Sequence, residues 1–169
     1  MTDSTPPPPM PPGASGASPA PQAMRPGTYL RLRREAAGLT HRHIAIVLVP
    51  AGRADAAELR ASMSRRLRLI ESDDQAGSNP SPRDLDLVDQ LGSVFAFSAA
   101  IYWLLVGIAA DPESEIPVPQ ICRGCGCTWS DPCNERGRGC AWSAEDPSLC
   151  TTCADKAPAN DLAEAGHAA

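Results

Sequence analysis

Aromatic residues are scarce in this sequence of 169 residues, in which Phe, Trp and Tyr together make up 4%. Hydrophobic residues reach 43%, but much of that share is alanine, so we expect any core to be small. Eighteen prolines indicate that a substantial part of the chain is linker or unfolded sequence. A chain of this length can form one ordinary domain with additional segments, or two small domains.

An export signal is also lacking at the start of the sequence. The first 26 residues contain nine prolines, no basic region and no apolar run of the length that a signal peptide needs. We expect residues 1–26 to form a disordered tail that is prone to polyproline conformation. A protein without an export signal is expected in the cytoplasm, where thiols stay reduced.

Charge is missing from the twenty residues between Leu91 and Ala110, which are enough to span a bilayer. The nearest flanking charges are acidic, and no cluster of Lys or Arg is present to orient a membrane helix. Ser98 can also cap a new helix inside this stretch. We therefore expect two buried helical segments and no membrane contact, with a membrane span as the alternative.

The charges that are present are unevenly distributed. Residues 25–70 contain ten arginines and carry a net charge of +7, residues 71–169 carry −11, and the whole chain carries −5. A basic segment joined to an acidic one suggests that the basic part faces a polyanion. The alternative is a solvated helical face that is rich in arginine.

Hydrophobic spacing and capping residues predict five helices and a mainly α fold. Gly38 is expected to end the first helix, Thr40 to cap the second, and Ser81 to cap the fourth. The expected helices cover residues 27–38, 39–49 and 54–74, a segment that begins at Pro82, and residues 98–109. Along the chain we expect a tail (1–26), a helix-turn-helix-like domain (27–110), a linker (111–120), a cysteine-rich zinc-binding module (121–154) and a disordered tail (155–169).

All seven cysteines occur within the module at residues 121–154. Two C-x2-C pairs, Cys122/Cys125 and Cys150/Cys153, are separated by 24 residues. In a reducing compartment this spacing is typical of a structural site in which four thiolates surround a zinc ion. We therefore predict that these four cysteines bind one Zn²⁺.

The remaining cysteines, Cys127, Cys133 and Cys140, suggest a second zinc ion, completed by a bridging cysteine, His167 or water. A plain thiol or redox role for one of them is the alternative. The spacing does not match an iron–sulfur site, and it does not assign the ligands between two zinc sites. We expect one or two zinc ions per chain.

A module of this size has almost no core of its own, so a metal must hold it together. Trp129 and Trp142 are expected to pack over the metal site. The alternative is that they form a platform on which bases stack. The acidic residues that surround them in the sequence disfavour this alternative, because they would repel nucleic acid.

The helical part carries a resemblance to a known family. The segment "YLRLRREAAGLT", the small residue Ala45 in the second helix and "LRLIE" at residues 67–71 resemble the Cro-type (XRE-like) helix-turn-helix phage repressors, over about residues 27–108. The resemblance implies sequence-specific DNA binding and transcription regulation, with the third helix in the major groove. The sequence departs from the family at "VPAGRADAAELRAS", which stands in place of a short turn and is able to re-aim or lengthen the third helix.

On this resemblance we expect Arg65 and Arg66 to contact bases, because a guanidinium has the reach and geometry to bind guanine or phosphate. The alternative for both is a set of surface salt bridges with Glu58, Asp73 and Asp74.

We expect Arg31, Arg33, Arg34 and Arg42 to contact phosphates and so to fix the register on double-stranded DNA. A single copy makes few contacts, so useful affinity is expected to need a homodimer on a two-fold site.

The segment from "CRGCGCT" to "DPSLCTTC" resembles cysteine-rich segments of bacterial phage and mobile-element proteins, a resemblance that implies no defined activity. The sequence contains no paired carboxylates, nucleophile–base pair or phosphate-binding loop, so we expect neither an enzyme nor a small-molecule substrate. The leading hypothesis is a cytoplasmic DNA-binding regulator with a structural zinc module. The alternative is a zinc-stabilised adaptor that binds proteins and has a degenerate helix-turn-helix.

Overall fold

The computed structural model describes residues 23–72, 82–135 and 138–156. The helical part contains α1 (Pro26–Ala36), α2 (His41–Leu48), α3 (Ala56–Glu71), α4 (Pro82–Leu91) and α5 (Ala99–Ala110). The cysteine-rich part contains the short antiparallel strands β1 (Asn134–Glu135) and β2 (Arg138–Gly139) and the single-turn helix α6 (Thr151–Ala154). The expected mainly α fold, with five helices ahead of a cysteine cluster, is confirmed.

The end of α1 and the start of α2 are set by the residues that the sequence predicts. Gly38 has a φ of 68°, a left-handed conformation that glycine adopts without strain and that commonly ends a helix. Thr40 caps α2, because its hydroxyl accepts a hydrogen bond from the backbone N–H of His43 at 3.2 Å. The His43 ring nitrogen Nδ1 accepts one in return from the Thr40 N–H at 3.3 Å. Ser81, which is expected to cap the fourth helix, lies outside the described residues.

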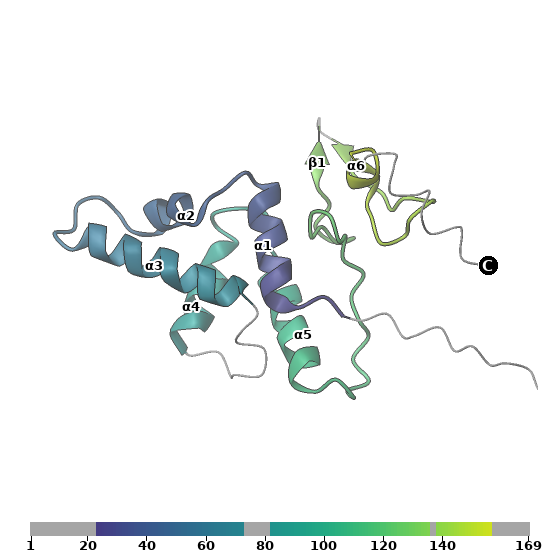
Figure 1. Cartoon of the computed structure of the whole chain (residues 1–169), viewed down its shortest axis with the longest axis horizontal. Helices are drawn as coiled ribbons and strands as arrows, with labels where there is room; N and C mark the ends of the chain where they lie inside the picture. The colour runs from purple at the N-terminus through teal and green to yellow at the C-terminus, as the bar shows by residue number, and fades with distance from the viewer. Residues whose placement is uncertain (1–22, 73–81, 136–137, 157–169) are drawn as a thin grey trace, which may run out of the picture.

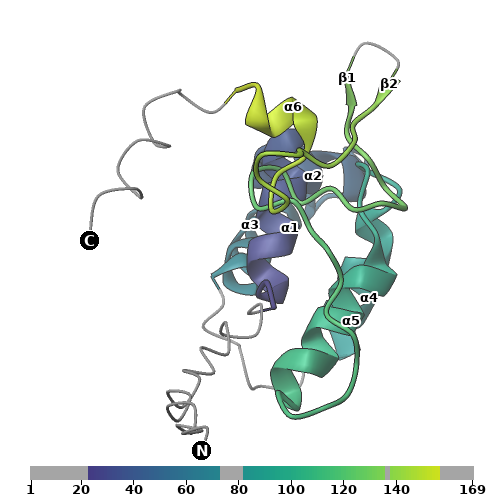
Figure 2. The ribbon, with the colours of Figure 1, turned by 90° about the vertical axis from the view of Figure 1, so that its right-hand side faces the viewer.

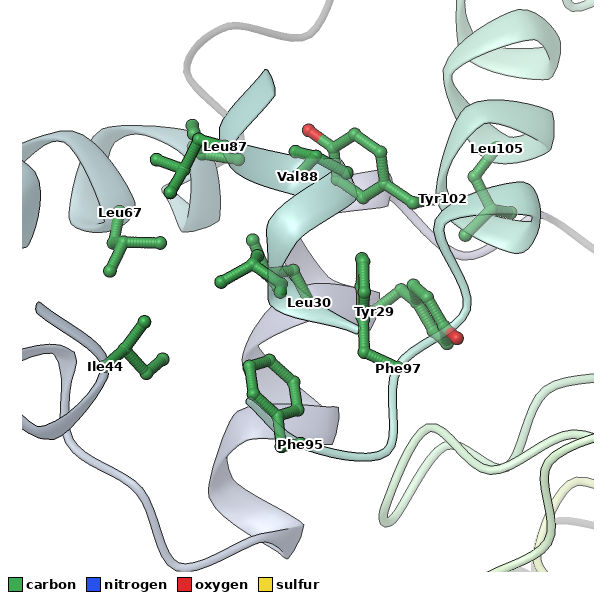
Figure 3. Close-up of a cluster of buried hydrophobic side chains, with 12 residues drawn as sticks. Tyr29, Leu30, Ile44, Leu67, Leu87, Val88, Phe95, Phe97, Tyr102 and Leu105 are labelled. Atoms are coloured by element: carbon green, nitrogen blue, oxygen red, sulfur yellow. The ribbon is translucent and has the colours of Figure 1, made fainter. Parts of the chain in front are cut away.

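The hydrophobic core is formed mainly by α1, α3, α4 and α5 and by the turn between α4 and α5 (Figure 3). The few aromatic residues concentrate here, since both phenylalanines and both tyrosines of the chain belong to this core. The rings of Tyr29 and Phe97 are 5.5 Å apart, and those of Phe95 and Phe97 are 5.7 Å apart. Aromatic pairs at this separation attract each other beyond the burial of their area, so a small aromatic content still yields a packed centre.

The uncharged stretch from Leu91 to Ala110 is divided, as expected. The helix α4 ends at Leu91, and α5 begins only at Ala99 after a turn. The Ser98 hydroxyl caps α5 by accepting a hydrogen bond from the Ile101 N–H at 3.3 Å. The Ser98 N–H itself donates to the Tyr29 hydroxyl at 3.2 Å, which ties the turn to α1. Among the described residues, no helix has both the length and the hydropathy needed to cross a membrane.

The sequence inserted between the second and third helices is half helical. Because α2 ends at Leu48 and α3 begins at Ala56, the connection is residues 49–55 and the rest of the insertion lengthens α3 at its N-terminal end. The Arg60 guanidinium closes the connection by donating two hydrogen bonds, of 3.0 and 2.7 Å, to the Val49 carbonyl. The insertion is therefore a fixed part of the α2–α3 pair.

The cysteine-rich segment lies against the C-terminal end of α1. Residues 111–120 run from the end of α5 back along the helical part to this position (Figures 1 and 2). The connection between α2 and α3 lies at the opposite end of the molecule from β1 and α6, with α1 and α5 between them (Figure 1). The α2–α3 connection and the cysteine-rich segment thus lie at opposite ends of the molecule, whereas α1 contacts the cysteine-rich segment.

Candidate metal centre

The two C-x2-C pairs occupy two turns that backbone hydrogen bonds bring together. In the first turn, the Gly126 N–H donates to the Cys122 carbonyl at 2.8 Å and the Cys122 N–H donates to the Cys127 carbonyl at 2.9 Å. The second pair begins at Cys150, where the Cys153 N–H donates to the Cys150 carbonyl at 3.0 Å at the start of α6. The Cys150 N–H points at the Cys122 sulfur at 3.3 Å, which joins the two turns directly.

All seven cysteines are free thiols, and none forms a disulfide. The sulfur atoms of Cys122, Cys125, Cys150 and Cys153 all lie within 4.8 Å of one another. This is the ligand set that the C-x2-C spacing predicts, and its ability to hold a metal ion is confirmed. The first three of these residues are buried, and Cys153 is partly buried.

A second group of four sulfurs overlaps with the first. It consists of Cys125, Cys127, Cys133 and Cys150, whose sulfurs also lie within 4.8 Å of one another. Cys125 and Cys150 thus belong to both groups. Cys140 belongs to neither, although its sulfur is 3.5 Å from that of Cys127.

The distances between sulfurs match those around a tetrahedral metal ion. A zinc–sulfur bond of about 2.3 Å places tetrahedral sulfurs about 3.8 Å apart. The sulfur of Cys150 lies 3.8 Å from that of Cys125 and 3.6 Å from that of Cys133, and the Cys125 and Cys133 sulfurs are 4.0 Å apart. The thiols therefore already stand where the ligands of such an ion would stand.

The protonation of the cluster also calls for a cation. Hydrogen bonds from the Cys125 and Cys127 thiols hold the pKa of Cys122 far below its ordinary value, whereas burial raises the pKa of Cys153 to about 12 and that of Cys140 to about 11. Thiolates that are packed this closely repel one another, so few of these cysteines ionise together without a counter-charge. A bound cation removes this repulsion and lets several cysteines ionise together.

Two glycines permit the close packing of this region. A Cβ atom on Gly124 would lie 2.9 Å from the Cys153 sulfur, so a side chain there would push one C-x2-C turn away from the other. Gly126 has a φ of 72°, and a Cβ atom there would lie 3.0 Å from Cδ of Arg33 on α1. The first glycine is needed for the thiol cluster, and the second for its contact with the helical part.

Arg33 connects the cysteine-rich segment to the helices, and the expectation that it contacts phosphate is wrong. Its side chain is 3% exposed. Its guanidinium donates to the Asp131 carboxylate at 2.7 Å and to the Ala96 carbonyl at 2.8 Å. Burial of the guanidinium at this contact removes Arg33 from the surface. Residues 111–120 form no regular element, and the ion pair between Arg33 and Asp131 ties together the two hydrophobic clusters that they connect.

The two tryptophans of the segment differ in their surroundings. Trp142 is partly buried and packs against the cysteine cluster, as expected. Trp129 is 82% exposed, so the expectation that it also packs over the site is wrong. Trp142 pairs through its backbone with Cys150, whereas Trp129 follows the buried Thr128 at the outside of a turn. His167, a possible ligand on sequence grounds, lies outside the described residues.

The other arginines expected to touch DNA divide into exposed and engaged side chains. Arg31, Arg42 and Arg65 are exposed, and none forms an ion pair with a residue that the structure describes. The guanidinium of Arg34 is buried against Glu71. Arg66 is half-buried and pairs with Asp84 on α4, a partner that differs from those considered from the sequence.

Sequence reasoning passed over Arg68, which is exposed one turn after Arg65 on α3 and also lacks an ion pair within the described part of the chain. The spacing of three residues, which places two helical side chains on one face, is the signal that would have found it.

The chain matches no family model, no curated protein and no solved structure. The likeness to the Cro-type repressors stays a prediction.

Proposed function

We propose that the protein is a DNA-binding regulator in which α2 and α3 contact double-stranded DNA and a zinc-holding module supports α1 from the opposite side. The observation that carries this proposal is the set of exposed arginines without ion pairs among the described residues: Arg42 on α2, and Arg65 and Arg68 on α3. Arginines left unpaired on adjacent helices are suited to phosphate and guanine contacts.

The position of these arginines within the helices suggests how DNA would be contacted. In a helix-turn-helix the first residues of the second helix reach the base edges. Here α3 begins with Ala56, Ala57 and Glu58, which offer no cation, and Arg65 and Arg68 come more than two turns later. We infer that the middle of α3 follows the groove, with Arg42 at the start of α2 on a phosphate.

The acidic half of the chain does not oppose this arrangement. The cysteine-rich segment lies at the far end of the molecule from the connection between α2 and α3 (Figure 1). Its acidic side chains are partly neutralised, since Asp131 pairs with Arg33 and Asp146 pairs with Arg123 at 2.6 Å. Repulsion between this segment and a bound DNA is therefore reduced by these ion pairs.

We infer that the metal of the cysteine module is zinc. Thiolate ligands alone, at tetrahedral spacing, suit Zn²⁺ better than the divalent cations that prefer oxygen ligands. A closed set of four protein ligands is typical of a structural ion rather than a catalytic one. The role of the ion is to hold a segment that has almost no hydrophobic core.

DNA binding is tested by selection from a random pool of duplexes at near-physiological salt, using the full chain. We expect one sequence class to be enriched. Arg65→Ala/Arg68→Ala should lower its affinity, by about 1–3 kcal/mol for each base contact that is lost. Arg42→Ala should weaken binding to all sequences and flatten the salt dependence by about 0.9 in log–log slope.

The matched control is Arg53→Ala, which removes an exposed arginine that is paired with Asp55 on the same connection. Its affinity for the enriched sequence should stay close to that of the wild type. If no sequence is enriched, or if the Arg65→Ala/Arg68→Ala variant binds as tightly as the control, the DNA-binding proposal is wrong.

A protein-binding adaptor is the second candidate, because large apolar side chains are exposed on the same helices. Val47 on α2 is 63% exposed and Leu69 on α3 is 56% exposed. Such residues on neighbouring helices are typical of a surface that a protein covers. On this candidate, Val47→Ser/Leu69→Ser would abolish association with a partner protein while Arg65→Ala/Arg68→Ala would leave it unchanged.

A further inference from the structure

We propose that the cysteine-rich segment holds two metal ions that share the thiolates of Cys125 and Cys150. The starting point is the overlap of the two groups of sulfurs, which have these two members in common. In this arrangement Cys122 and Cys153 complete the first ion and Cys127 and Cys133 complete the second. The proposal rests on the zinc part of the proposed function and is independent of DNA binding.

The number of cysteines requires sharing if each ion has four thiolates. Two independent sites would need eight thiolates, and the chain has seven. The histidines near α2 do not supply a replacement, because the His41 ring nitrogen Nε2 lies 2.9 Å from the Glu71 carboxylate and the His43 ring caps α2. A second ion bound by four thiolates therefore has to share sulfurs with the first, and the third histidine, His167, lies outside the described residues.

The geometry identifies which sulfurs are shared. Two tetrahedra that share an edge have their bridging sulfurs about 3.8 Å apart when the metal–sulfur bonds are about 2.3 Å. The Cys125 and Cys150 sulfurs are 3.8 Å apart. Cys133 lies 3.6 Å from one of them and 4.0 Å from the other, as ligands of one ion do, and it belongs to the second group alone, which makes it a terminal ligand. The sequence spacing alone predicts that both C-x2-C pairs bind the same single ion.

Charge also favours the shared edge. One Zn²⁺ with four thiolates has a net charge of −2, and two Zn²⁺ with six thiolates also have a net charge of −2. The second ion therefore enters without adding charge to a segment in which Arg33 and Arg123 are already paired with aspartates. Two ions that kept separate sets of four would bring a net charge of −4, which a buried cluster disfavours.

Cys140 is left outside both coordination shells. Its sulfur lies 3.5 Å from that of Cys127, and its backbone N–H donates to the Cys133 carbonyl at 3.0 Å. A protonated Cys140 would donate its S–H to the Cys127 thiolate and hold this terminal ligand in place, as groups next to metal ligands commonly do. The alternative is a cluster in which Cys140 is itself a ligand and only one sulfur bridges.

The first test counts metal ions in the full chain by native mass spectrometry after purification without chelator. We expect two zinc ions per chain for the wild type, two for Cys140→Ala, and one for Cys127→Ala. The two cysteine variants form a matched pair, because their sulfurs are neighbours and the same atoms are removed. Loss of an ion from Cys140→Ala would show that Cys140 is a ligand, and would overturn the shared edge.

The second test needs no substitution. Cadmium loaded into the wild-type protein should give two NMR signals that are coupled to each other through the bridging sulfurs. Two uncoupled signals would overturn the proposal. A wild type that holds only one ion would overturn the shared cluster and leave the single zinc site intact. A wild type that holds no metal and forms disulfides would overturn both, whatever its affinity for DNA.

Discussion

Arg34 of α1 and Glu71, the last residue of α3, form a buried ion pair with two parallel hydrogen bonds. Arg34 Nε and Nη2 donate to the Glu71 carboxylate oxygens at 2.7 and 2.8 Å, and the two residues are 8% and 6% exposed. The hydrogen bonds with Glu71 raise the pKa of Arg34. Arg34 also donates to the Leu39 carbonyl at 2.9 Å, so one guanidinium joins the turn after α1 to the C-terminal end of α3. The direction of α3 therefore depends on this pair.

Removing one partner of this pair should destabilise the fold strongly. We expect Glu71→Gln to lower the free energy of unfolding by about 3 kcal/mol, because it leaves the buried Arg34 guanidinium with only the exposed Glu35 carboxylate, 3.2 Å away, as a counterion. Urea unfolding followed by circular dichroism would measure this loss. The control, Asp55→Asn, breaks the exposed pair with Arg53 and should leave the urea midpoint close to that of the wild type.

The double variant Arg34→Met/Glu71→Met separates charge burial from a requirement for the pair itself. It replaces both buried charges with apolar side chains, and we expect it to recover most of the stability lost in Glu71→Gln. If Glu71→Gln unfolds at the same urea concentration as the wild type, the pair does not hold α3 against α1.

Tyr29 should make the helical part sensitive to alkaline pH. Burial raises the pKa of Tyr29 above the ordinary value of a tyrosine, while the hydrogen bond from the Ser98 N–H acts in the opposite direction. Because the folded state holds the neutral phenol, its contribution to stability is full below about pH 10, the pKa of an unperturbed tyrosine. It is lost as the pH rises through the higher value of the folded state.

The variant Tyr29→Phe isolates this effect. At pH 7 we expect it to be less stable than the wild type by about 1 kcal/mol, because the Ser98 N–H loses its acceptor. Above pH 10 the difference should shrink, since phenylalanine does not ionise. Urea midpoints measured at both pH values would check this, and a constant difference between the two proteins would contradict it.

The ends of the helices could be predicted because their signals are local. Gly38, Thr40 and Ser98 act on backbone groups within a few residues of themselves, so the sequence contains all the information that is needed. The buried faces were harder to predict. On α4, Leu85 is 40% exposed and Leu87 is buried, since neighbouring faces of a helix satisfy similar spacings and packing against other elements decides between them.

The first thiol group could be predicted for the same reason, because each C-x2-C pair is a single turn. The membership of Cys125 and Cys150 in both thiol groups could not be predicted, since it depends on how two turns meet in space. Nor does any local pattern indicate that Arg33 pairs with Asp131, which is 98 residues away along the chain. The prediction that Trp129 packs over the site came from composition alone. The turn that carries Trp129 instead leaves its side chain exposed.

Gly126 tests the contact between the cysteine-rich segment and α1. We expect Gly126→Ala to destabilise the protein by more than the roughly 1–2 kcal/mol that a left-handed φ costs a non-glycine residue. The additional loss arises because the new methyl group would displace the Arg33 side chain. Gly38→Ala is the matched control, since Gly38 has a similar φ of 68° but no atom within 4 Å of the added Cβ. Equal shifts in the thermal midpoint for the two variants would show that the contact contributes nothing.

Metal removal should weaken the helical part as well as the cysteine-rich segment. With the ions chelated, the segment loses the order that presents Asp131, so the Arg33 guanidinium loses its carboxylate and keeps the Ala96 carbonyl as its remaining hydrogen-bond partner among the described residues. We expect amides of α1 and α5 to exchange hydrogen faster in the presence of chelator. Because a hydrogen bond to a charged group contributes about 1.5–3 kcal/mol, the increase should be more than tenfold where exchange follows unfolding.

The variant Asp131→Asn separates this coupling from metal binding. It keeps all seven cysteines, so it should bind the same number of ions as the wild type, but its α1 amides should exchange faster even when the metal is bound. Chelation should then produce a smaller further change than in the wild type, because part of the contact is already lost. If chelation leaves exchange in α1 and α5 unchanged in the wild type, the two parts fold independently, and the ion pair between Arg33 and Asp131 does not connect them energetically.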